Sequence, residues 1–321
     1  MYLSYPSSID PALELYAAFD LPEKPGYLHL HFHGWHGGIK PHRDNVNAVN
    51  AGRNWFFIRP EMRGRGSSGG TPDCNGFELQ DAVDAVDFAR KNFPELILEP
   101  EKVWLSGGSG GGGNVLAALG KFPDFFCRAH ADCGVYDYAR WFRDDAVGEF
   151  RDEMEGKNWI GGTPDTNPEA YRSRSGLTTV GNLLTPLIVF HGEKDIRVPA
   201  LQARLLLEEA SKQGKNALLS YFELPETGGS DHWTGITPEL REFREKTAAN
   251  FMALPSPRIT IPRRGRFTVA GYLKTREFEV RLDSIDRVAE LEYDLDGDSF
   301  KLNARGLLLR NGHDGPGETV L

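Results

Sequence analysis

The sequence predicts an α/β protein with a doubly wound, mostly parallel sheet, followed by a small C-terminal domain that is all β. Three observations lead to this prediction. Apolar strand segments alternate with helical segments over the first 255 residues, which is the pattern of a sheet covered on both faces. A strand–turn–helix unit with the sequence G-x-S-x-G lies within this alternation. After Pro257 the pattern changes to short segments of alternating polarity, which predict strands alone.

Local signals predict the elements of the first part in order. Residues 22–26 contain proline and glycine and separate the first two strands, and the helix at 77–93 carries apolar side chains on one face. Apolar runs predict strands at 13–19, 27–32, 55–59, 103–105, 129–133, 187–190 and 220–224. The segments between them predict helices at 44–51, 77–93, 114–119, 201–212 and 238–254. Residues 1–255 are therefore expected to form one domain.

Residues 138–185 interrupt this alternation between two late strands. The segment carries several large aromatic side chains among many charged ones. Loops at the carboxyl ends of parallel strands surround ligands, so we expect the segment to fold over that edge of the sheet as a cap. An ordinary surface excursion is the alternative.

The sequence Pro255-Ser256-Pro257 ends the α/β pattern and predicts a domain boundary. Residues 256–321 are expected to form a small module that resembles a β-sandwich, with a loose tail at 311–317. Strands are predicted at 258–261, 266–273, 278–282, 289–295, 300–302 and 307–309. Asp296-Gly297 stands between two of them and predicts a β-hairpin turn. The surrounding acidic residues also resemble part of a calcium loop, but Asn303 stands where that loop needs a glutamate.

Composition restricts the class of function. The chain has 37 basic and 46 acidic side chains, and the net charge of −9 lies in the first 255 residues, which argues against binding to nucleic acid. The three cysteines, Cys74, Cys127 and Cys133, lack metal-ligand spacing and suit a reduced, cytoplasmic protein. Residues 1–6 do not read as a signal peptide, and no apolar run approaches the length of a membrane span. A cytoplasmic location without a membrane partner is therefore expected.

The run Gly107-Gly108-Ser109-Gly110-Gly111 predicts a nucleophile. A serine on a sharp turn between a buried strand and a helix has an exposed hydroxyl, and neighbours with a Cβ would collide with both elements. The N–H of Gly110, at the helix start, would face a developing oxyanion. A glycine linker would not be flanked by buried elements, and a phosphate loop would need a Lys-Ser/Thr ending. Ser106 is a weaker candidate because it lies within the strand.

A serine hydroxyl needs a base, and the base needs an acid that orients it. In a doubly wound hydrolase these follow along the chain in the order Ser, Asp or Glu, His. Asp195 comes just after a buried strand and His232 lies in a loop after the last strand, so we predict them as acid and base. Glu193 is the reserve acid. The backbone N–H of Trp35, in a turn after an early strand, is predicted as the second oxyanion donor.

These residues need no cofactor, and none is predicted. His29, His31 and His33 alternate along a strand and could imitate a set of metal ligands, but no carboxylate or cysteine cluster nearby completes such a site, so no metal is expected. The expected partner is a small-molecule or short peptide acyl substrate, and the formation of a homo-oligomer is left open.

Several further motifs accompany the serine turn: His33-Gly34, Arg63-Gly64-Arg65-Gly66-Ser67, Phe122-Pro123-Asp124, Trp159-Ile160-Gly161-Gly162, His191-Gly192-Glu193-Lys194-Asp195 and Asp231-His232. Together they resemble the catalytic domain of the prolyl oligopeptidase-like, S9-type branch of the α/β-hydrolases over residues 10–253. The resemblance implies an α/β-hydrolase fold for the first domain. It also implies Ser109 as nucleophile, Asp195 as acid and His232 as base.

The chain departs from this branch in two ways. Peptidases of the branch commonly carry a large N-terminal β-propeller, and nothing of that size precedes the hydrolase segment here. The residue after the nucleophile is often a tyrosine, and here it is Gly110. We therefore predict a serine hydrolase that cleaves an ester or amide through an acyl-enzyme, with an esterase slightly favoured. An S9-like peptidase is the alternative, and a non-catalytic binding protein on the same scaffold is a further one.

Overall fold

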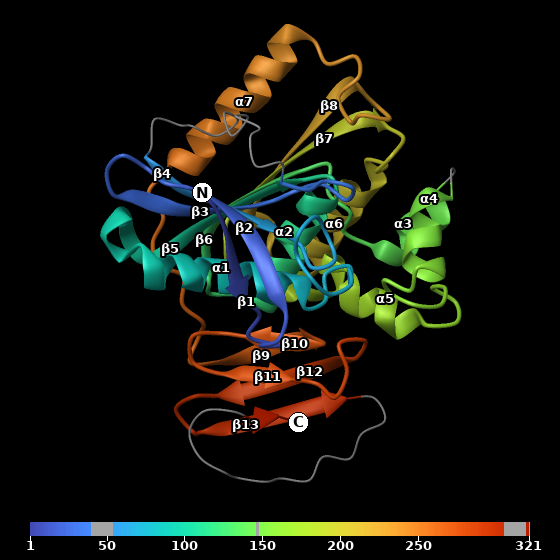
Figure 1. The fold of residues 1–321 in the computed structure, drawn as a ribbon. Coiled ribbons are helices and arrows are strands. Elements are labelled where there is room, and N and C mark those ends of the chain that lie inside the picture. Colours follow the sequence, from blue (N-terminus) through green and yellow to red (C-terminus); the bar gives the residue numbers. More distant parts are fainter. Residues whose placement is uncertain (40–53, 146–147, 305–318, 321) are drawn as a thin grey trace.

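An eight-stranded, mostly parallel sheet lies at the centre of the protein (Figure 1). The computed structural model describes residues 1–39, 54–145, 148–304 and 319–320. The strands are β1 Tyr2–Pro6, β2 Glu14–Asp20, β3 Gly26–Phe32, β4 Trp55–Glu61, β5 Ile97–Gly108, β6 Phe126–Asp132, β7 Leu187–Asp195 and β8 Leu219–Gly229. Their order is β1-β2-β4-β3-β5-β6-β7-β8, and all pairs are parallel except β1–β2 and β2–β4. The predicted doubly wound α/β fold is confirmed.

Helices cover both faces of the sheet, because successive side chains of a strand point to opposite faces. In β7, Leu187 and Val189 join the core shared with α1, α2 and α6, whereas Ile188 and Phe190 pack in the layer that contains α7. The long helices are α1 Glu78–Asn92, α2 Gly110–Lys121, α6 Leu201–Lys212 and α7 Pro238–Ala253. Two 3₁₀ turns precede β5 and β8, namely η2 Pro94–Leu96 and η5 Asn216–Leu218.

Several predicted elements have different ends in the structure. Strand β5 begins at Ile97 rather than at residue 103, because its first residues pair with β3 ahead of an irregularity in the register. Helix α2 already begins at Gly110, so its first turn is made of glycines, whose low helix propensity hid it from sequence analysis. Strand β1 was not predicted, and it is held by antiparallel pairing with β2. The helix predicted at 44–51 lies outside the described residues.

The segment 138–185, predicted as a cap, runs between β6 and β7 as a series of short helices. They are α3 Tyr138–Asp144, α4 Glu149–Arg151, the π-helical η3 Asp152–Gly156, α5 Pro168–Arg174 and the 3₁₀ helix η4 Gly176–Asn182. We call this segment the insertion. Its aromatic side chains, including Trp141, Phe150 and Trp159, form a cluster against which Trp35 packs from the turn after β3. The function of the insertion as a cap stays a prediction.

A second sheet, the β-module, lies below the first in Figure 1. Its strands are β9 Arg264–Ala270, β10 Tyr272–Lys274, β11 Glu279–Arg281, β12 Val288–Asp294, β13 Ser299–Ala304 and β14 Thr319–Val320, in the order β13-β12-β9-β10-β11-β14. All pairs are antiparallel except β11–β14. The ring of Phe278, beside β11, lies 5.2 Å from that of Tyr293 and 5.1 Å from that of Phe300. The strands that the structure describes in this segment thus belong to one sheet with a shared core, and the sandwich-like arrangement of the whole module stays a prediction.

Other expectations for this part of the chain have mixed outcomes. The strand predicted at 258–261 is wrong, because Pro257 and Pro262 flank it and lack the N–H that a ladder needs. The strand predicted at 307–309 and the tail at 311–317 lie outside the described residues. The domain boundary at Ser256 stays a prediction.

The turn between β12 and β13 is the hairpin predicted at Asp296-Gly297. Asp294 pairs with Ser299 across the turn. One oxygen of the Asp294 carboxylate accepts the N–H groups of Asp296 and Gly297, at 3.0 and 2.9 Å. This carboxylate therefore closes the turn, which is a common task of aspartate in such loops.

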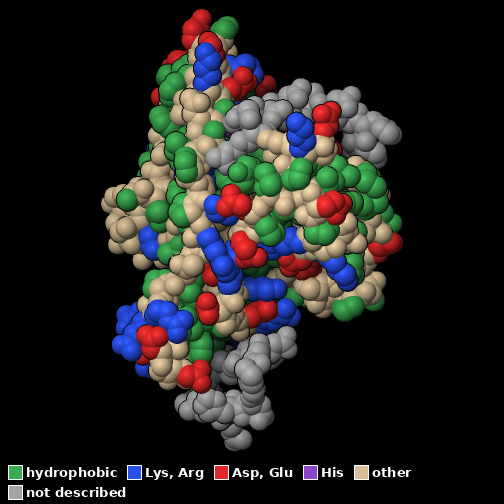
Figure 2. Space-filling view, turned by 90° about the vertical axis from the view of Figure 1, so that its left-hand side faces the viewer, with side chains coloured by type: hydrophobic (Ala, Val, Ile, Leu, Met, Phe, Trp, Pro, Cys, Tyr) green, Lys and Arg blue, Asp and Glu red, His purple; other side chains and the backbone are tan. Residues whose placement is uncertain are grey.

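Charged side chains of both signs are interspersed on the face shown in Figure 2. In the β-module, exposed arginines near β9 pair with acidic residues near β12. The pairs are Arg263–Asp296, Arg264–Asp294 and Arg266–Glu292, at 2.9, 2.9 and 2.8 Å. Among the helices that the structure describes, none combines the length and the apolar character that crossing a bilayer requires.

Buried polar groups join the β-module to the first sheet and its helices. Tyr272 of β10 packs into the main core beside Phe77, and its hydroxyl donates to the carbonyl oxygen of Gly76 at 3.0 Å. Lys121, the last residue of α2, is only 2% exposed and donates to the carbonyl oxygen of Ala270. Burial lowers the pKa of the Lys121 amine from 10.5 to about 7. The junction is therefore part of the interior.

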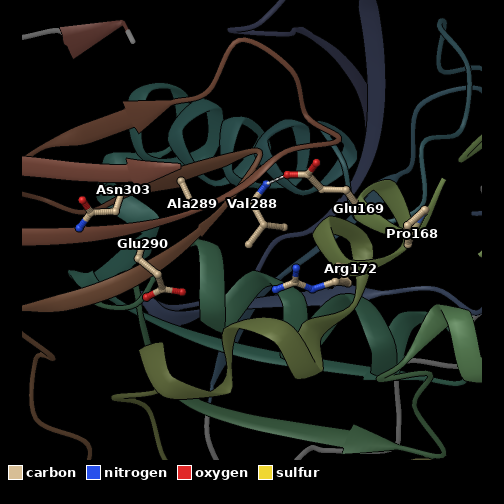
Figure 3. Close-up of a pocket in the computed structure, with 7 residues that line it drawn as sticks. All are labelled: Pro168, Glu169, Arg172, Val288, Ala289, Glu290 and Asn303. Carbon is tan, nitrogen blue, oxygen red and sulfur yellow. Dashed lines mark hydrogen bonds between the residues drawn. The ribbon is translucent and has the colours of Figure 1, made fainter. Parts of the chain in front are cut away.

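A groove of about 630 Å³ lies between α5 and strands β12 and β13 (Figure 3). The Glu169 carboxylate connects α5 to β12, because it accepts the N–H of Val288 at 3.1 Å. The same carboxylate pairs with Arg287 at 3.1 Å. The lining contains charged side chains, such as Arg172 and Glu290, as well as apolar ones. The groove follows the seam between the insertion and the β-module.

Candidate active site

Ser109 stands on a sharp turn between β5 and α2. Its backbone has φ 58° and ψ −123°, a conformation that costs a serine energy and persists only where its surroundings impose it. A Cβ on Gly107 would lie 2.4 Å from the carbonyl oxygen of Gly111, so the turn excludes larger residues at that position. The N–H of Ser109 donates to the carbonyl oxygen of Asp132 on β6 at 2.8 Å. These contacts fix the serine at the carboxyl ends of the central strands.

The structure brings Ser109, Asp195 and His232 together in one hydrogen-bonded chain. Asp195 ends β7 and His232 lies in the loop after β8, so neighbouring parallel strands deliver the two residues to the same edge of the sheet. The Nδ1 atom of His232 is 2.6 Å from Oδ2 of Asp195, and its Nε2 atom is 2.9 Å from Oγ of Ser109. With Nδ1–H donating to the carboxylate, Nε2 is able to accept the serine proton.

Asp195 is oriented by its own turn. Its Oδ1 atom accepts the N–H groups of the residues two and three positions later, both at 2.9 Å, and its Oδ2 atom faces His232. The carboxylate is fully buried, which strengthens a hydrogen bond to it. Glu193, the reserve acid, is exposed and accepts the N–H of Glu226 at 2.9 Å. The structure therefore places Asp195, and not Glu193, beside the imidazole.

Two backbone N–H groups lie next to Ser109. Gly110 is the first residue of α2, so its N–H has no acceptor within the helix. The turn that carries Trp35 comes so close that a Cβ on Gly110 would lie 2.7 Å from the Trp35 nitrogen. A Cβ on Gly34 would lie 3.7 Å from the Cβ of Ser109. Both predicted oxyanion donors are therefore beside the serine, and a side chain at position 110 would push the turn away.

Glu153 of the insertion holds the turn that carries Trp35, and sequence analysis missed this residue. Its buried carboxylate accepts hydrogen bonds from the indole N–H of Trp35 and from Nε2 of His36, the latter at 2.9 Å. Glu153 stands 118 positions from Trp35 and lies outside the motifs listed above. Only the packing of the insertion reveals the contact.

A pocket opens beside Gly110, between the Trp35 turn, the start of α1 and the insertion. Aromatic side chains such as Tyr138 and Trp159 line it together with two ionisable residues, Arg65 and Glu78. The Arg65 guanidinium lies 4.3 Å above the Trp159 ring, and Glu78 accepts the side-chain amide of Asn114 at 3.1 Å. Burial, with a smaller contribution from a nearby aspartate, raises the pKa of Glu78 from 4.5 to about 7. Sequence analysis missed Glu78 because it reads as an ordinary residue of a helix start.

His29 and His31 share a hydrogen-bond partner, the hydroxyl of Ser106, at 2.7 and 2.9 Å. Burial lowers the pKa of His29 well below 6.5 and that of His31 to about 4, so both rings are neutral at pH 7. The nitrogens of His33 face other partners, the carbonyl oxygen of the next residue at 2.8 Å and a backbone N–H at 3.3 Å. The three rings therefore do not converge as metal ligands, and Ser106, the weaker nucleophile candidate, has buried histidine partners of its own.

Among the described residues, Cys133, His191 and Asp195 bring atoms of the kind that ligate metals within 4.8 Å of one another. The histidine and the aspartate already make hydrogen bonds of their own, and burial favours the neutral form of the thiol. Burial raises the pKa of the Cys133 thiol well above 9.0, and His191 Nε2 lies 2.7 Å from the carbonyl oxygen of Val198. The oxygens of Asp195 face its turn and His232. We therefore interpret Cys133 and His191 as residues that surround Asp195 and not as metal ligands.

The model of the prolyl oligopeptidase family matches residues 42–252, which is more than half of the chain. The chain belongs to this family. The match confirms the resemblance to S9-type hydrolases that the motifs predicted, and it includes the serine turn, Asp195 and His232.

Relatives of this prolyl oligopeptidase family member include two proteins of Bacillus subtilis (strain 168), both called uncharacterized peptidases. YtmA is 30% identical over 199 residues, which cover 59% of this chain and 69% of YtmA. YuxL is 29% identical over 150 residues, which cover 47% of this chain and 22% of YuxL. The chain thus spans less than a quarter of YuxL.

Solved structures share the fold at lower sequence identity. An acylaminoacyl peptidase in complex with Z-Gly-Gly-Phe-chloromethyl ketone has a TM-score of 0.68 at 20% identity, with 82% of this chain and 42% of that chain covered. An esterase of Pyrococcus furiosus has a TM-score of 0.55 at 13% identity, with 79% of this chain and 93% of that chain covered. These likenesses establish the fold that surrounds the site.

Proposed function

We propose that the protein is a serine hydrolase that cleaves an ester or amide bond through an acyl-enzyme. The observation that supports this most strongly is the continuous hydrogen-bonded chain from Asp195 through His232 to Ser109. A serine hydroxyl is a weak nucleophile until a base removes its proton, and an imidazole oriented by a carboxylate supplies that base. Membership in a hydrolase family agrees with this class of reaction.

In the first step, Oγ of Ser109 attacks the carbonyl carbon of the substrate while Nε2 of His232 takes the hydroxyl proton. The π electrons of the carbonyl group move to its oxygen, which becomes an oxyanion. The carboxylate of Asp195 stabilises the imidazolium. The backbone N–H groups of Gly110 and Trp35 donate to the oxyanion, and each such donor contributes a factor of roughly 10²–10³ to the rate.

Collapse of the tetrahedral intermediate breaks the bond to the leaving group, an alcohol or an amine, which receives the proton from His232. A water molecule then enters the site. His232 takes a proton from this water while the water oxygen attacks the acyl carbon. The second collapse releases the carboxylic acid and returns the proton to Ser109. Besides water, the cycle uses the three side chains of the hydrogen-bonded chain and the backbone N–H groups of Gly110 and Trp35.

Within this class we favour an esterase. The family often has a tyrosine after the nucleophile, whereas Gly110 and the close approach of Trp35 leave no room for such a side chain. Peptidase activity is the second candidate, favoured by the names of YtmA and YuxL.

Chromogenic substrates separate the two activities. We expect a higher kcat/KM on short-chain p-nitrophenyl esters than on aminoacyl arylamides. The Ser109→Ala variant, prepared in the same way, should lose both activities and thereby exclude a contaminating hydrolase. Activity confined to the arylamides would reverse the order of the two candidates.

A further inference from the structure

We propose that Glu153 is a positioning residue for catalysis. It holds residues 33–38, which we call the oxyanion turn, so that the backbone N–H of Trp35 stays beside Gly110 and Ser109. The inference rests on the proposed function, because it relies on a role of this N–H in binding an oxyanion. It gives the insertion a task in the chemical step itself.

The oxyanion turn has little structure of its own that would fix Trp35. It leaves β3 at Phe32, contains three glycines and is closed by a hydrogen bond from the Gly37 N–H to the Gly34 carbonyl oxygen at 2.8 Å. Glycine loses more conformational freedom on ordering than any other residue. The turn therefore needs contacts from outside to keep the Trp35 N–H in one orientation.

Glu153 supplies these contacts through a single atom. Its side chain is 7% exposed, and its Oε2 receives the indole N–H of Trp35 and faces Nε2 of His36 at 2.9 Å. The Nζ atom of Lys157 donates to the other oxygen at 3.4 Å. Hydrogen bonds to a carboxylate are roughly twice as strong as those between neutral groups. Two consecutive side chains of the oxyanion turn thus converge on one charged oxygen.

The backbone that presents Glu153 is also unusual. Residues 152–156 form a single π-helical turn, in which the N–H of Lys157 donates to the carbonyl oxygen of Asp152 at 2.8 Å. Such turns are rare and are frequently found at functional sites. Glu153 is buried within this turn, whereas Asp152 and Glu155 are exposed. The insertion therefore directs one buried carboxylate toward the oxyanion turn, while the exposed carboxylate of Glu149 lies farther from His36, at 3.7 Å.

The Trp35 side chain links this carboxylate to the reacting centre. Its ring centroid lies 5.0 Å from that of Trp141 and 5.5 Å from that of Trp159, while its backbone nitrogen lies beside Gly110. Without Glu153 the indole N–H loses the acceptor that the structure gives it, and the ring loses the hydrogen bond that fixes its orientation. A displacement of about 1 Å at a reacting centre costs about a hundredfold in rate.

The test compares Glu153→Ala and Glu153→Gln with Glu155→Gln, which alters an exposed carboxylate of the same π-helical turn. For a p-nitrophenyl ester, Glu153→Ala should lower kcat about 10- to 100-fold with KM changed less than about threefold. Its affinity for a boronic acid, which mimics the tetrahedral intermediate, should fall in parallel. Glu153→Gln should keep most of the activity because its amide oxygen still accepts the indole N–H. Glu155→Gln should behave as the wild-type protein does.

Trp35→Phe provides a second readout that does not depend on the folding of Glu153→Ala. It removes the indole N–H and keeps an aromatic ring, so kcat should fall while KM changes little. In the Trp35→Phe background, Glu153→Ala should cost less than it does alone, because the main contact is already lost. Fully multiplicative effects of the two substitutions would contradict the proposal.

A purely structural role of Glu153 leads to a different result. The melting temperature of Glu153→Ala would fall, while kcat and the affinity for the boronic acid would stay unchanged in the folded protein, and this outcome would overturn the proposal alone. A wild-type protein that neither hydrolyses esters nor reacts with a fluorophosphonate would overturn the proposed function and this inference together.

Discussion

The two ends of α2 hold polar groups in contrasting surroundings. At its start, Ser109 is hydrogen-bonded to His232, whose side chain remains 14% exposed. At its end, Lys121 is 2% exposed and donates to the carbonyl oxygens of Ala270 and Ser173. The first set of groups is open to an incoming substrate, whereas protein atoms enclose the second. The reactive groups therefore differ from the structural ones mainly in that they can be reached from the solvent.

Substitutions at the start of α2 should remove activity and spare stability. Ser109→Ala removes the attacking oxygen, so kcat for ester hydrolysis should fall by about 10⁴–10⁶. The free energy of unfolding should change by less than about 1 kcal/mol. Ser106→Ala is the matched control on the adjoining strand, and it should retain activity while losing stability, because His29 and His31 lose their shared partner. Equal losses of activity in both variants would contradict the assignment of catalysis to Ser109 and of a structural role to Ser106.

Asp195→Asn should have the next largest effect, a fall in kcat of about 10³–10⁴. The side-chain amide can donate to Nδ1 of His232, which favours the tautomer whose Nε2 carries a proton and cannot act as the base. Glu193→Gln is the control, since that carboxylate faces the solvent side of the same turn. Steady-state kinetics on one ester measures both variants. A Glu193→Gln protein that is as impaired as Asp195→Asn would reassign the acid.

Substitutions at the junction with the β-module should lower stability and leave activity unchanged. Tyr272→Ala removes a buried ring and should lower the free energy of unfolding by about 3–5 kcal/mol. Tyr272→Phe removes only the hydrogen bond to the Gly76 carbonyl oxygen and should cost about 1 kcal/mol. Activity per folded molecule should stay close to that of the wild-type protein, as urea unfolding and ester hydrolysis can show. A large loss of kcat at unchanged stability would place Tyr272 in the catalytic machinery.

The last effect is expected in the pH dependence of stability. Because the pKa of Lys121 falls from 10.5 to about 7 on folding, the unfolded chain binds more protons than the folded protein between these pH values. The contribution of Lys121 to stability is therefore least favourable below pH 7 and improves as the pH rises toward 10.5. The stability gained by Lys121→Met relative to wild type should shrink between pH 6 and pH 9 in urea unfolding. A difference that is independent of pH would show that Lys121 stays protonated in the folded protein.

The sequence predicted the elements around the reactive groups better than those around the structural ones. Ser109, Asp195 and His232 each lie at or just after the end of a strand, and parallel strands end at one edge of the sheet, so their positions along the chain indicated that they meet. Lys121 reads as a solvent-exposed residue at a helix end, and only the packing of the β-module and of α5 around it shows that it is buried. Glu153 depends in the same way on the fold of the insertion. Contacts that arise between separate segments leave no local pattern to detect.

The central claim is that Ser109 is activated by His232 and forms a covalent intermediate. The most direct test is mass spectrometry of the protein after reaction with a fluorophosphonate, followed by mapping of the modified peptide. We predict a single adduct on Ser109 that is absent from Ser109→Ala, unchanged in Ser106→Ala and formed much more slowly in a His232→Ala variant. No adduct on the wild-type protein, or an adduct on another residue, would contradict the account.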